Sequence, residues 1–286
     1  MSNLSHLDRI IALALAEDIG QGDVTTDATV PARALGRAEV IAKQPLVLAG
    51  LDVFARVYRQ VDRRVAVVTE LTDGAEVAAG AIALRLDGPT RALLTGERVA
   101  LNFLMHLSGV ATWTRRLRAA IADRPQVKLL DTRKTLPGLR ALEKAAVVAG
   151  GGANHRHGLF DGVLIKENHI LAAGSIGAAI ERARRHAHHL LRVQCEVTNL
   201  DELDQALAAG ADALLLDNMD QALLRQAVQR SRERRPEVFL EASGNMTAER
   251  LPLVAATGVD GISVGGLTHS APAVDLSLLL RPGVSV

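Results

Sequence analysis

Seven charged or protonatable side chains between residues 133 and 217 are candidates for chemistry. Those that are or can become cationic are Arg133, Lys134, His155, Arg156 and Lys166, and the anionic ones are Glu196 and Asp217. Arginine offers a planar fork for carboxylate oxygens and lysine a compact charge, so the cationic group suits an anion with several carboxylates or phosphates. Two carboxylates in the same cavity suit sugar hydroxyls, a bound Mg²⁺ or a positive charge that develops on carbon.

Two glycine-containing turns come later in the chain, Ser243-Gly244-Asn245 and Val264-Gly265-Gly266. They resemble phosphate cradles built from backbone N–H groups where a strand passes into a helix. Either turn alone is a weak signal. Two such turns after adjacent late strands resemble the phosphate site of many barrels.

These candidate site residues are far apart in the sequence, so they can line one site only if the helices and strands around them bring them together. Short apolar runs precede them, at Val127–Leu130, Gly162–Ile165, Leu191–Val197, Ala213–Leu216, Val238–Glu241 and Gly261–Val264. Helices are predicted between the runs, at Arg140–Ala149, Ser175–His186, Leu200–Ala209, Gln221–Gln229 and Ala248–Ala256. This alternation indicates parallel strands joined by crossover helices, in a barrel or a doubly wound sheet over residues 111–270. The carboxyl ends of such strands open on one face, where the polar residues should converge.

Residues 1 to about 110 are predicted to form a separate mixed α/β region. Ser5–Glu17 has helical spacing of apolar residues, Ala38–Ala42 and Val65–Glu70 are predicted strands, and Arg91–Gly109 is predicted to be one long helix. Gly74, Gly80 and Gly88-Pro89 are turn signals.

The composition limits the classes of function. The chain has 286 residues and a net charge of +1, so no general attraction to nucleic acid or a membrane surface is expected. Cys195 is the only cysteine, which excludes an intrachain disulfide and favours a small core residue. Apolar runs are short and no signal peptide is evident, so a cytoplasmic protein with no membrane span is expected.

Long motifs in this chain resemble those of the quinolinate phosphoribosyltransferases. In chain order the motifs are Glu17-Asp18-x-Gly20-x-Gly22-Asp23-Val24-Thr25-Thr26, Glu97-Arg98-x-Ala100-Leu101-Asn102, Asp131-Thr132-Arg133-Lys134-Thr135 with Pro137-Gly138-Leu139-Arg140, Gly151-Gly152 with His155-Arg156-x-Gly158-Leu159-x-Asp161, Leu164-Ile165-Lys166-Glu167-Asn168-His169, Leu216-Asp217-Asn218-Met219, Glu241-x-Ser243-Gly244-Asn245, and Ser263-Val264-Gly265-Gly266-Leu267-Thr268-His269-Ser270. The resemblance covers nearly the whole chain, and motifs this long are specific.

The resemblance implies an α/β fold of the type II phosphoribosyltransferase kind. An N-terminal α/β sandwich domain (residues 1–110, joined by 271–286) would precede an incomplete α/β barrel that carries catalysis (111–270). The activity implied is transfer of phosphoribosyl from phosphoribosyl pyrophosphate to quinolinate with decarboxylation, giving nicotinate mononucleotide, pyrophosphate and CO₂ for NAD biosynthesis. Mg²⁺ would accompany the pyrophosphate substrate, and no organic cofactor is needed.

The resemblance also implies roles for individual residues. Members are homodimers, and Arg98 would reach the site of the partner subunit. Arg133, His155, Arg156 and Lys166 would hold the quinolinate carboxylates, with Lys134 near substrate phosphate and Thr132 as a further substrate-binding residue. Glu196 and Asp217 would face the ribose and Mg²⁺, which they would hold directly or indirectly. The 5′-phosphate would lie on the two turns, at Ser243, Gly244, Asn245, Val264, Gly265 and Gly266, and His269 would be a further substrate-binding residue. Lys134, Lys166, Glu196 and Asp217 are the predicted catalytic residues.

Two positions depart from the family pattern. The family often has Glu where this chain has Gln194, and an acidic residue is common where Thr198 stands. Glu196 is assigned as the site carboxylate because Leu200 and Asp217 fix the register. A molybdate-associated subgroup shares the fold, but its arginine-lysine and histidine-arginine motifs differ, and the Asp131 and Asp161 motifs favour the quinolinate enzymes.

Two interpretations from other classes compete with the transferase. A lysine at a barrel strand end, such as Lys166, can form a Schiff base in a lyase. A non-catalytic sensor of phosphorylated metabolites would also need the cations, but plain anion binding gains nothing from Glu196 and Asp217.

Overall fold

The structure is a computed structural model that describes residues 5–281. Contacts divide the chain into two compact units. The first joins Met1–Arg115, Pro137–Gly151 and Ala271–Val286, and the second joins Arg116–Leu136 and Gly152–Ser270. None of the helices formed by residues 5–281 is long and apolar enough to cross a membrane.

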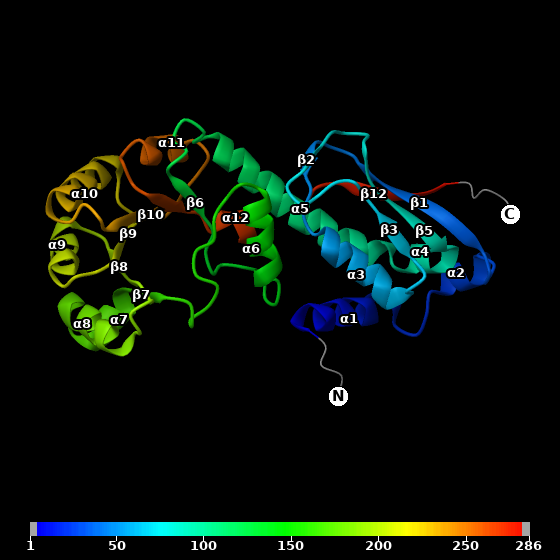
Figure 1. Ribbon diagram of the computed structural model, residues 1–286, viewed down its shortest axis with the longest axis horizontal. Coiled ribbons are helices and arrows are strands. Elements are labelled where there is room, and N and C mark those ends of the chain that lie inside the picture. Colours follow the sequence, from blue (N-terminus) through cyan, green and yellow to red (C-terminus); the bar gives the residue numbers. More distant parts are fainter. Residues whose placement is uncertain (1–4, 282–286) are drawn as a thin grey trace. The chain divides into compact units, whose positions relative to one another are not determined.

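The first unit is built on an antiparallel sheet of four strands in the order β12-β1-β5-β3 (Figure 1). Its strands are β1 (Leu35–Ala42), β3 (Ala66–Val68), β5 (Ile82–Pro89) and β12 (Leu276–Arg281), beside a small pair of β2 (Leu46–Val47) and β4 (Glu76–Val77). Its helices are α1 (His6–Ile19), α2 (Val24–Thr29), α3 (Leu51–Val61), α4 (Thr90–Thr95), α6 (Arg140–Ala149) and most of α5 (Glu97–Ala119), which runs past the unit boundary at Arg115. The last strand of the chain therefore pairs with the first, which closes this unit around an apolar core.

The helix predicted over Arg91–Gly109 is wrong as a single element. The structure has α4 and α5 with Gly96 between them, and α5 continues to Ala119. A β-carbon at Gly96 would lie 2.9 Å from the ring of Tyr58, a fully buried residue. The residue between the two helices is therefore a glycine that lies close to Tyr58, a tertiary contact that apolar spacing does not reveal.

The second unit contains the six parallel strands that the alternating pattern predicts, in the order β6-β11-β10-β9-β8-β7. They are β6 (Lys128–Leu130), β7 (Val163–Ile165), β8 (Val193–Val197), β9 (Ala213–Asp217), β10 (Phe239–Ser243) and β11 (Gly261–Ser263). The helices are α7 (Glu167–Ala173), α8 (Ile176–His186), α9 (Leu200–Ala208), α10 (Gln221–Arg234), α11 (Arg250–Ala255) and α12 (Gly266–His269). The edge strands β6 and β7 do not pair, and only an isolated bridge from Leu130 to Ala153 extends the β6 edge, so the barrel is incomplete.

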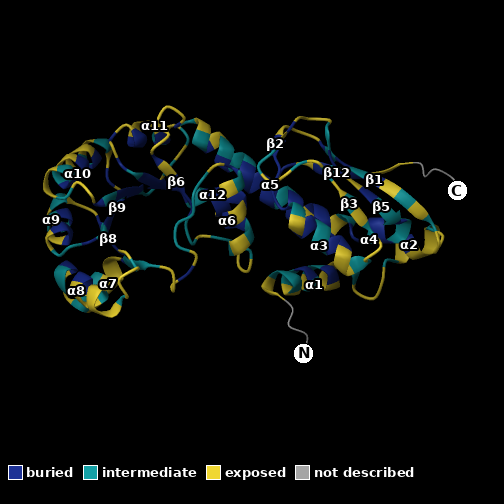
Figure 2. Ribbon diagram, in the orientation of Figure 1, coloured by how far each residue is buried: buried dark blue, intermediate teal, exposed yellow. Residues whose placement is uncertain are grey.

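The strands of the second unit are dark in Figure 2 because most of their residues are buried. Burial on both faces explains why they appear in the sequence as apolar runs rather than as an alternating pattern. Cys195 is a core residue of β8, as expected, and burial together with nearby Glu202 and Glu196 raises the pKa of its thiol to about 12.

Candidate active site

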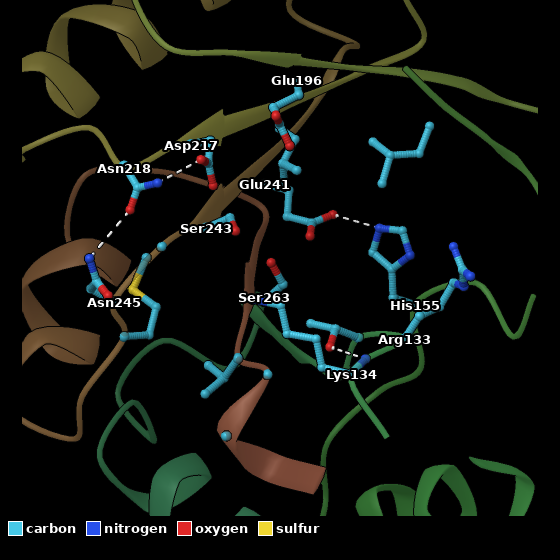
Figure 3. A pocket seen from close by; sticks show the side chains of 18 of the residues that line it. Arg133, Lys134, His155, Glu196, Asp217, Asn218, Glu241, Ser243, Asn245 and Ser263 are labelled. Carbon is cyan, nitrogen blue, oxygen red and sulfur yellow. Dashed lines mark hydrogen bonds and ion pairs between the residues drawn. The ribbon is translucent and has the colours of Figure 1, made fainter. Parts of the chain in front are cut away.

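A cavity of about 680 Å³ opens at the carboxyl ends of the strands of the second unit (Figure 3). Its wall includes all seven charged residues singled out from the sequence, Arg133, Lys134, His155, Arg156, Lys166, Glu196 and Asp217. It also includes Thr132, Ser243, Gly244, Asn245, Val264, Gly265, Gly266 and His269. The expected convergence at the carboxyl edge of the sheet is therefore confirmed.

Lys134 is held through its main chain. The Thr132 hydroxyl accepts a hydrogen bond from the Lys134 N–H at 3.0 Å, and the Thr268 hydroxyl donates to the Lys134 carbonyl at 2.7 Å. A β-carbon at Gly265 would come within 3.0 Å of Lys134 Cδ, so the lysine side chain passes close over this glycine. The loop after β6 and the turn after β11 thus fix the lysine together.

Arg156 lies in a cationic part of the wall. Its guanidinium donates to the Gly162 carbonyl at 3.0 Å. Burial, and then repulsion from Arg133, hold the pKa of Arg156 below its ordinary value against the attraction of Asp161. The repulsion between these two guanidinium groups favours binding of an anion with more than one negative charge.

Glu196 and Lys166 form an ion pair across the neighbouring strands β7 and β8. The carboxylate is mostly buried, with 13% of its side chain exposed, whereas the lysine side chain is 48% exposed. Asp217 accepts a hydrogen bond from Asn218 Nδ2 at 2.7 Å. The acidic side of the cavity therefore contains one carboxylate paired with a lysine and one bonded to an amide.

The turns after β9 and β10 have a backbone that few residue types adopt. Asn218 and Asn245 have positive φ angles of 52° and 47°, and Gly244 has a φ of 96°. A β-carbon at Gly244 would lie 2.1 Å from Asn218 Oδ1. The Arg250 guanidinium donates to the carbonyls of Gly244 at 2.7 Å and Met219 at 2.8 Å, which ties the two turns together.

We expect Gly244→Ala to distort this turn. The strained φ costs about 1–3 kcal/mol, and the methyl group must also displace Asn218. The Tm should fall, and the affinity for a ligand held at this turn should drop about tenfold, which corresponds to ~1.4 kcal/mol.

Gly177→Ala is the matched control for this substitution. Gly177 lies within α8 at an ordinary φ, and a β-carbon there would meet nothing within 4 Å. This variant should be stabilised by about 0.4–1 kcal/mol, since alanine restricts the unfolded chain. A Gly244→Ala protein as stable as the control would contradict the expected strain.

The sequence did not single out every functional side chain in the cavity. Glu241 is 2% exposed and lines the wall, and Gln194 on β8 donates to it at 2.9 Å. A carboxylate at the end of an apolar run such as Val238–Glu241 is the signal that marks Glu241, because a buried charge needs partners. Further lining residues not predicted are Leu164, Leu215, Asn218, Met246 and Ser263. Arg98 belongs to the first unit, where it is exposed in the first turn of α5.

No group of three or more potential ligands that could hold a metal ion by itself occurs among residues 5–281. The cavity carboxylates Glu196 and Asp217 offer the hard oxygen donors that Mg²⁺ prefers. Mg²⁺ is commonly bound by one or two carboxylates together with substrate phosphates, so these residues fit a metal that arrives with its substrate.

Comparison with known proteins places this geometry in a family. Residues 23–108 match the family model of the quinolinate phosphoribosyl transferase N-terminal domain, and residues 110–279 match that of the C-terminal domain. The chain is 44% identical over 271 residues to the nicotinate-nucleotide pyrophosphorylase (carboxylating) of Mycobacterium leprae, covering 94% of this chain and 95% of that protein. The structure of the nicotinate-nucleotide pyrophosphorylase from Francisella tularensis superposes with a TM-score of 0.91 at 42% identity, covering 96% of both chains.

Proposed function

The chain belongs to the quinolinate phosphoribosyltransferase family, and from this membership we propose how its cavity carries out the reaction. The enzyme is a pentosyltransferase of NAD biosynthesis. It joins quinolinate to the ribosyl carbon of phosphoribosyl pyrophosphate and releases pyrophosphate and CO₂, leaving nicotinate mononucleotide. The observation that carries the proposal is the meeting of five cationic or protonatable side chains and two carboxylates in one cavity.

Quinolinate lies against the cationic wall in this proposal. It is a pyridine with two adjacent carboxylates, and Arg133, Arg156 and Lys166 pair with them. The repulsion between Arg133 and Arg156 supports this assignment, since a dianion relieves it. Orientation of the ring nitrogen toward the anomeric carbon can lower the barrier by roughly 7–11 kcal/mol.

The phosphoribosyl group lies on the opposite wall. Backbone N–H groups of the turns at Ser243–Asn245 and Val264–Gly266 receive the 5′-phosphate, and Lys134 takes up charge as pyrophosphate leaves. The ribose then gains positive charge, which Glu196 and Asp217 stabilise. Mg²⁺, when bound with the pyrophosphate substrate, supplies further neutralisation of phosphate charge near these two carboxylates.

Decarboxylation follows from the product of this transfer. Once the ring nitrogen is quaternary, the ring can hold the electron pair left by the departing C2 carboxylate, and a proton then takes the place of CO₂. The protein has only to keep the ring oriented. This is why the reaction needs no organic cofactor.

The assembly proposed is a homodimer in which Arg98 enters the partner's cavity. Arg98 is exposed in the first unit and is not among the residues that line the cavity of the second, which supports this assignment. We also propose that residues 1–110 with 271–286 and residues 111–270 are the two functional domains of the family.

Family membership sets aside both competing interpretations from the sequence. The Schiff-base alternative also lacks support in the geometry, because Lys166 is engaged in an ion pair with Glu196. No observation in the cavity favours a binding protein without catalysis.

Release of CO₂ from carboxyl-labelled quinolinate tests the proposed reaction. Purified protein with quinolinate, phosphoribosyl pyrophosphate and Mg²⁺ should release CO₂ and form nicotinate mononucleotide in equal amounts. Omission of phosphoribosyl pyrophosphate should abolish the release, because decarboxylation depends on the quaternary nitrogen. Release of CO₂ without the second substrate would contradict the order of steps.

A further inference from the structure

Arg250 contacts two turns of the cavity wall although it does not line the cavity itself. It is the first residue of α11 and is half-buried. Its Nη1 donates to the carbonyls of Gly244 at 2.7 Å and Asn245 at 3.3 Å, and its Nη2 donates to the carbonyl of Met219 at 2.8 Å. Gly244 and Asn245 belong to the cavity wall, and Arg250 does not. One guanidinium therefore contacts the turns after β9 and β10 through their main-chain atoms.

The direction of a carbonyl group determines the direction of the N–H group in the same peptide. The peptides of residues 5–281 are trans, and in a planar trans peptide the C=O and the following N–H point in opposite directions. The Gly244 carbonyl shares its peptide with the Asn245 N–H, and the Asn245 carbonyl shares its peptide with the Met246 N–H. Because both carbonyls accept from Arg250, both N–H groups point away from Arg250. Asn245 and Met246 line the cavity.

The turn after β10 also contacts the turn after β9 directly. The Asn218 N–H donates to the Ser243 carbonyl at 3.0 Å, and Asn245 Nδ2 donates to Asn218 Oδ1 at 3.5 Å (Figure 3). A displacement of the first turn would therefore displace the second. Arg250 bonds to both turns, so it fixes their spacing as well as the direction of individual peptides.

We propose that Arg250 is a positioning residue that directs the N–H groups of Asn245 and Met246 toward the 5′-phosphate of the ribosyl substrate. The proposal rests on the proposed function. Backbone N–H groups are neutral donors, and they bind an anion when they converge on it, so their orientation decides their contribution. Arg250 itself does not touch the substrate. It differs in this respect from Lys134, which lines the cavity and brings its own charge to the substrate.

The planar guanidinium suits this role because it carries two nitrogens at a fixed spacing. Nη1 bonds to the turn after β10, and Nη2 bonds to the turn after β9. Lysine would keep the positive charge but offers one nitrogen on a flexible stem, which does not impose that spacing. Arg250→Lys therefore separates the bridging of two turns from attraction between a positive charge and the phosphate.

Arg232 provides a matched control at the other end of the same strand. It is also half-buried, and its Nη1 donates to the carbonyls of Pro236 at 3.0 Å and Val238 at 2.8 Å, which directly precede β10. Its Nη2 donates to Asp260 at 2.7 Å. Arg232 does not line the cavity, which lies at the carboxyl ends of the strands. Arg232→Met should therefore lower the Tm without changing phosphate binding.

The affinity for ribose 5-phosphate tests the proposal, because this molecule has the 5′-phosphate and lacks the pyrophosphate. Titration calorimetry measures its Kd for the full-length wild type, Arg250→Met, Arg250→Lys and Arg232→Met. The Kd should rise about tenfold in Arg250→Met, since charge-assisted hydrogen bonds that hold the turns are lost. Arg250→Lys should show a similar rise, and Arg232→Met should keep the wild-type Kd.

Steady-state kinetics separate positioning from a general loss of structure. In Arg250→Met the KM for phosphoribosyl pyrophosphate should rise by the same factor as the Kd of ribose 5-phosphate. The KM for quinolinate and the inhibition constant of inorganic pyrophosphate should stay at their wild-type values, because those ligands are assigned to other parts of the wall. A cavity that had lost its structure would weaken binding of all the ligands, and that result would overturn the proposal.

Three results of the calorimetry would also overturn it. They are a wild-type Kd in Arg250→Met, a wild-type Kd in Arg250→Lys, and a rise in Arg232→Met as large as that in Arg250→Met. Where Arg250→Met does not fold, Arg250→Lys decides: a raised Kd supports the bridging of the turns, and an unchanged Kd contradicts it. A wild type that binds no ribose 5-phosphate would likewise overturn the proposal. Failure to release CO₂ by a wild type that binds ribose 5-phosphate would instead contradict the proposed function.

Discussion

Replacement of Lys134 by alanine should lower kcat/KM for phosphoribosyl pyrophosphate by about 10²- to 10³-fold, the usual effect of removing one donor that stabilises transition-state charge. The Tm should change little. The lysine side chain is exposed in the cavity, and the bonds that fix its loop are made by main-chain atoms, so alanine leaves them in place. The loss therefore reports on catalysis rather than on folding.

Lys43→Ala is the control for Lys134→Ala. Lys43 is exposed in the first unit and does not line the cavity, so this substitution removes a lysine charge without changing the cavity wall. Steady-state kinetics with both substrates varied, together with thermal unfolding of both variants, measure the effect. Turnover by Lys134→Ala at the wild-type rate would remove the lysine from the proposed mechanism.

Mixed dimers of Arg98→Ala and Lys134→Ala chains should regain activity that neither variant has alone. If Arg98 acts in the partner's cavity, a mixed dimer has one site with both defects and one site with none. Random pairing of equal amounts makes half of the dimers mixed, so activity should reach about a quarter of that of the wild type. Co-expression of the two chains with different purification tags gives the preparation to be assayed.

The control for this experiment pairs Lys134→Ala with Asp217→Ala. Both residues line the cavity of the same unit, so every site of a mixed dimer has one defect and no activity should return. Recovery in neither pair would show that Arg98 does not act across subunits. Recovery in both pairs would show that the regained activity does not depend on Arg98.

The catalytic unit was largely predictable from the sequence because its strands are short, buried and each followed by polar residues. The helix at Arg140–Ala149 was predicted with its observed bounds, and the bounds of the six strands differ from prediction by at most two residues at either end. The convergence of Lys134, Lys166 and Asp217 follows from parallel topology alone, since such strands end on one face. The spacing of apolar and polar residues along the chain was therefore enough to predict most of the site.

Contacts between distant side chains could not be predicted in the same way. Gly96 lies close to Tyr58, and Gln194 donates a hydrogen bond to Glu241, which lies 47 positions further along the chain. Burial of Glu241 was hidden because β10 continues to Ser243, beyond the predicted end of the strand. The sequence alone does not distinguish the end of a strand from its interior, because the partner strand is not known.

The burial of Cys195 has a practical consequence for experiments on this enzyme. Its thiol is the only one in the chain, and it is buried and protonated at neutral pH. Alkylating reagents should therefore not react with it in the folded protein. A cysteine introduced on the surface would then accept a single fluorophore without prior removal of the native one. Chains labelled with donor and acceptor dyes could follow subunit exchange by energy transfer in real time.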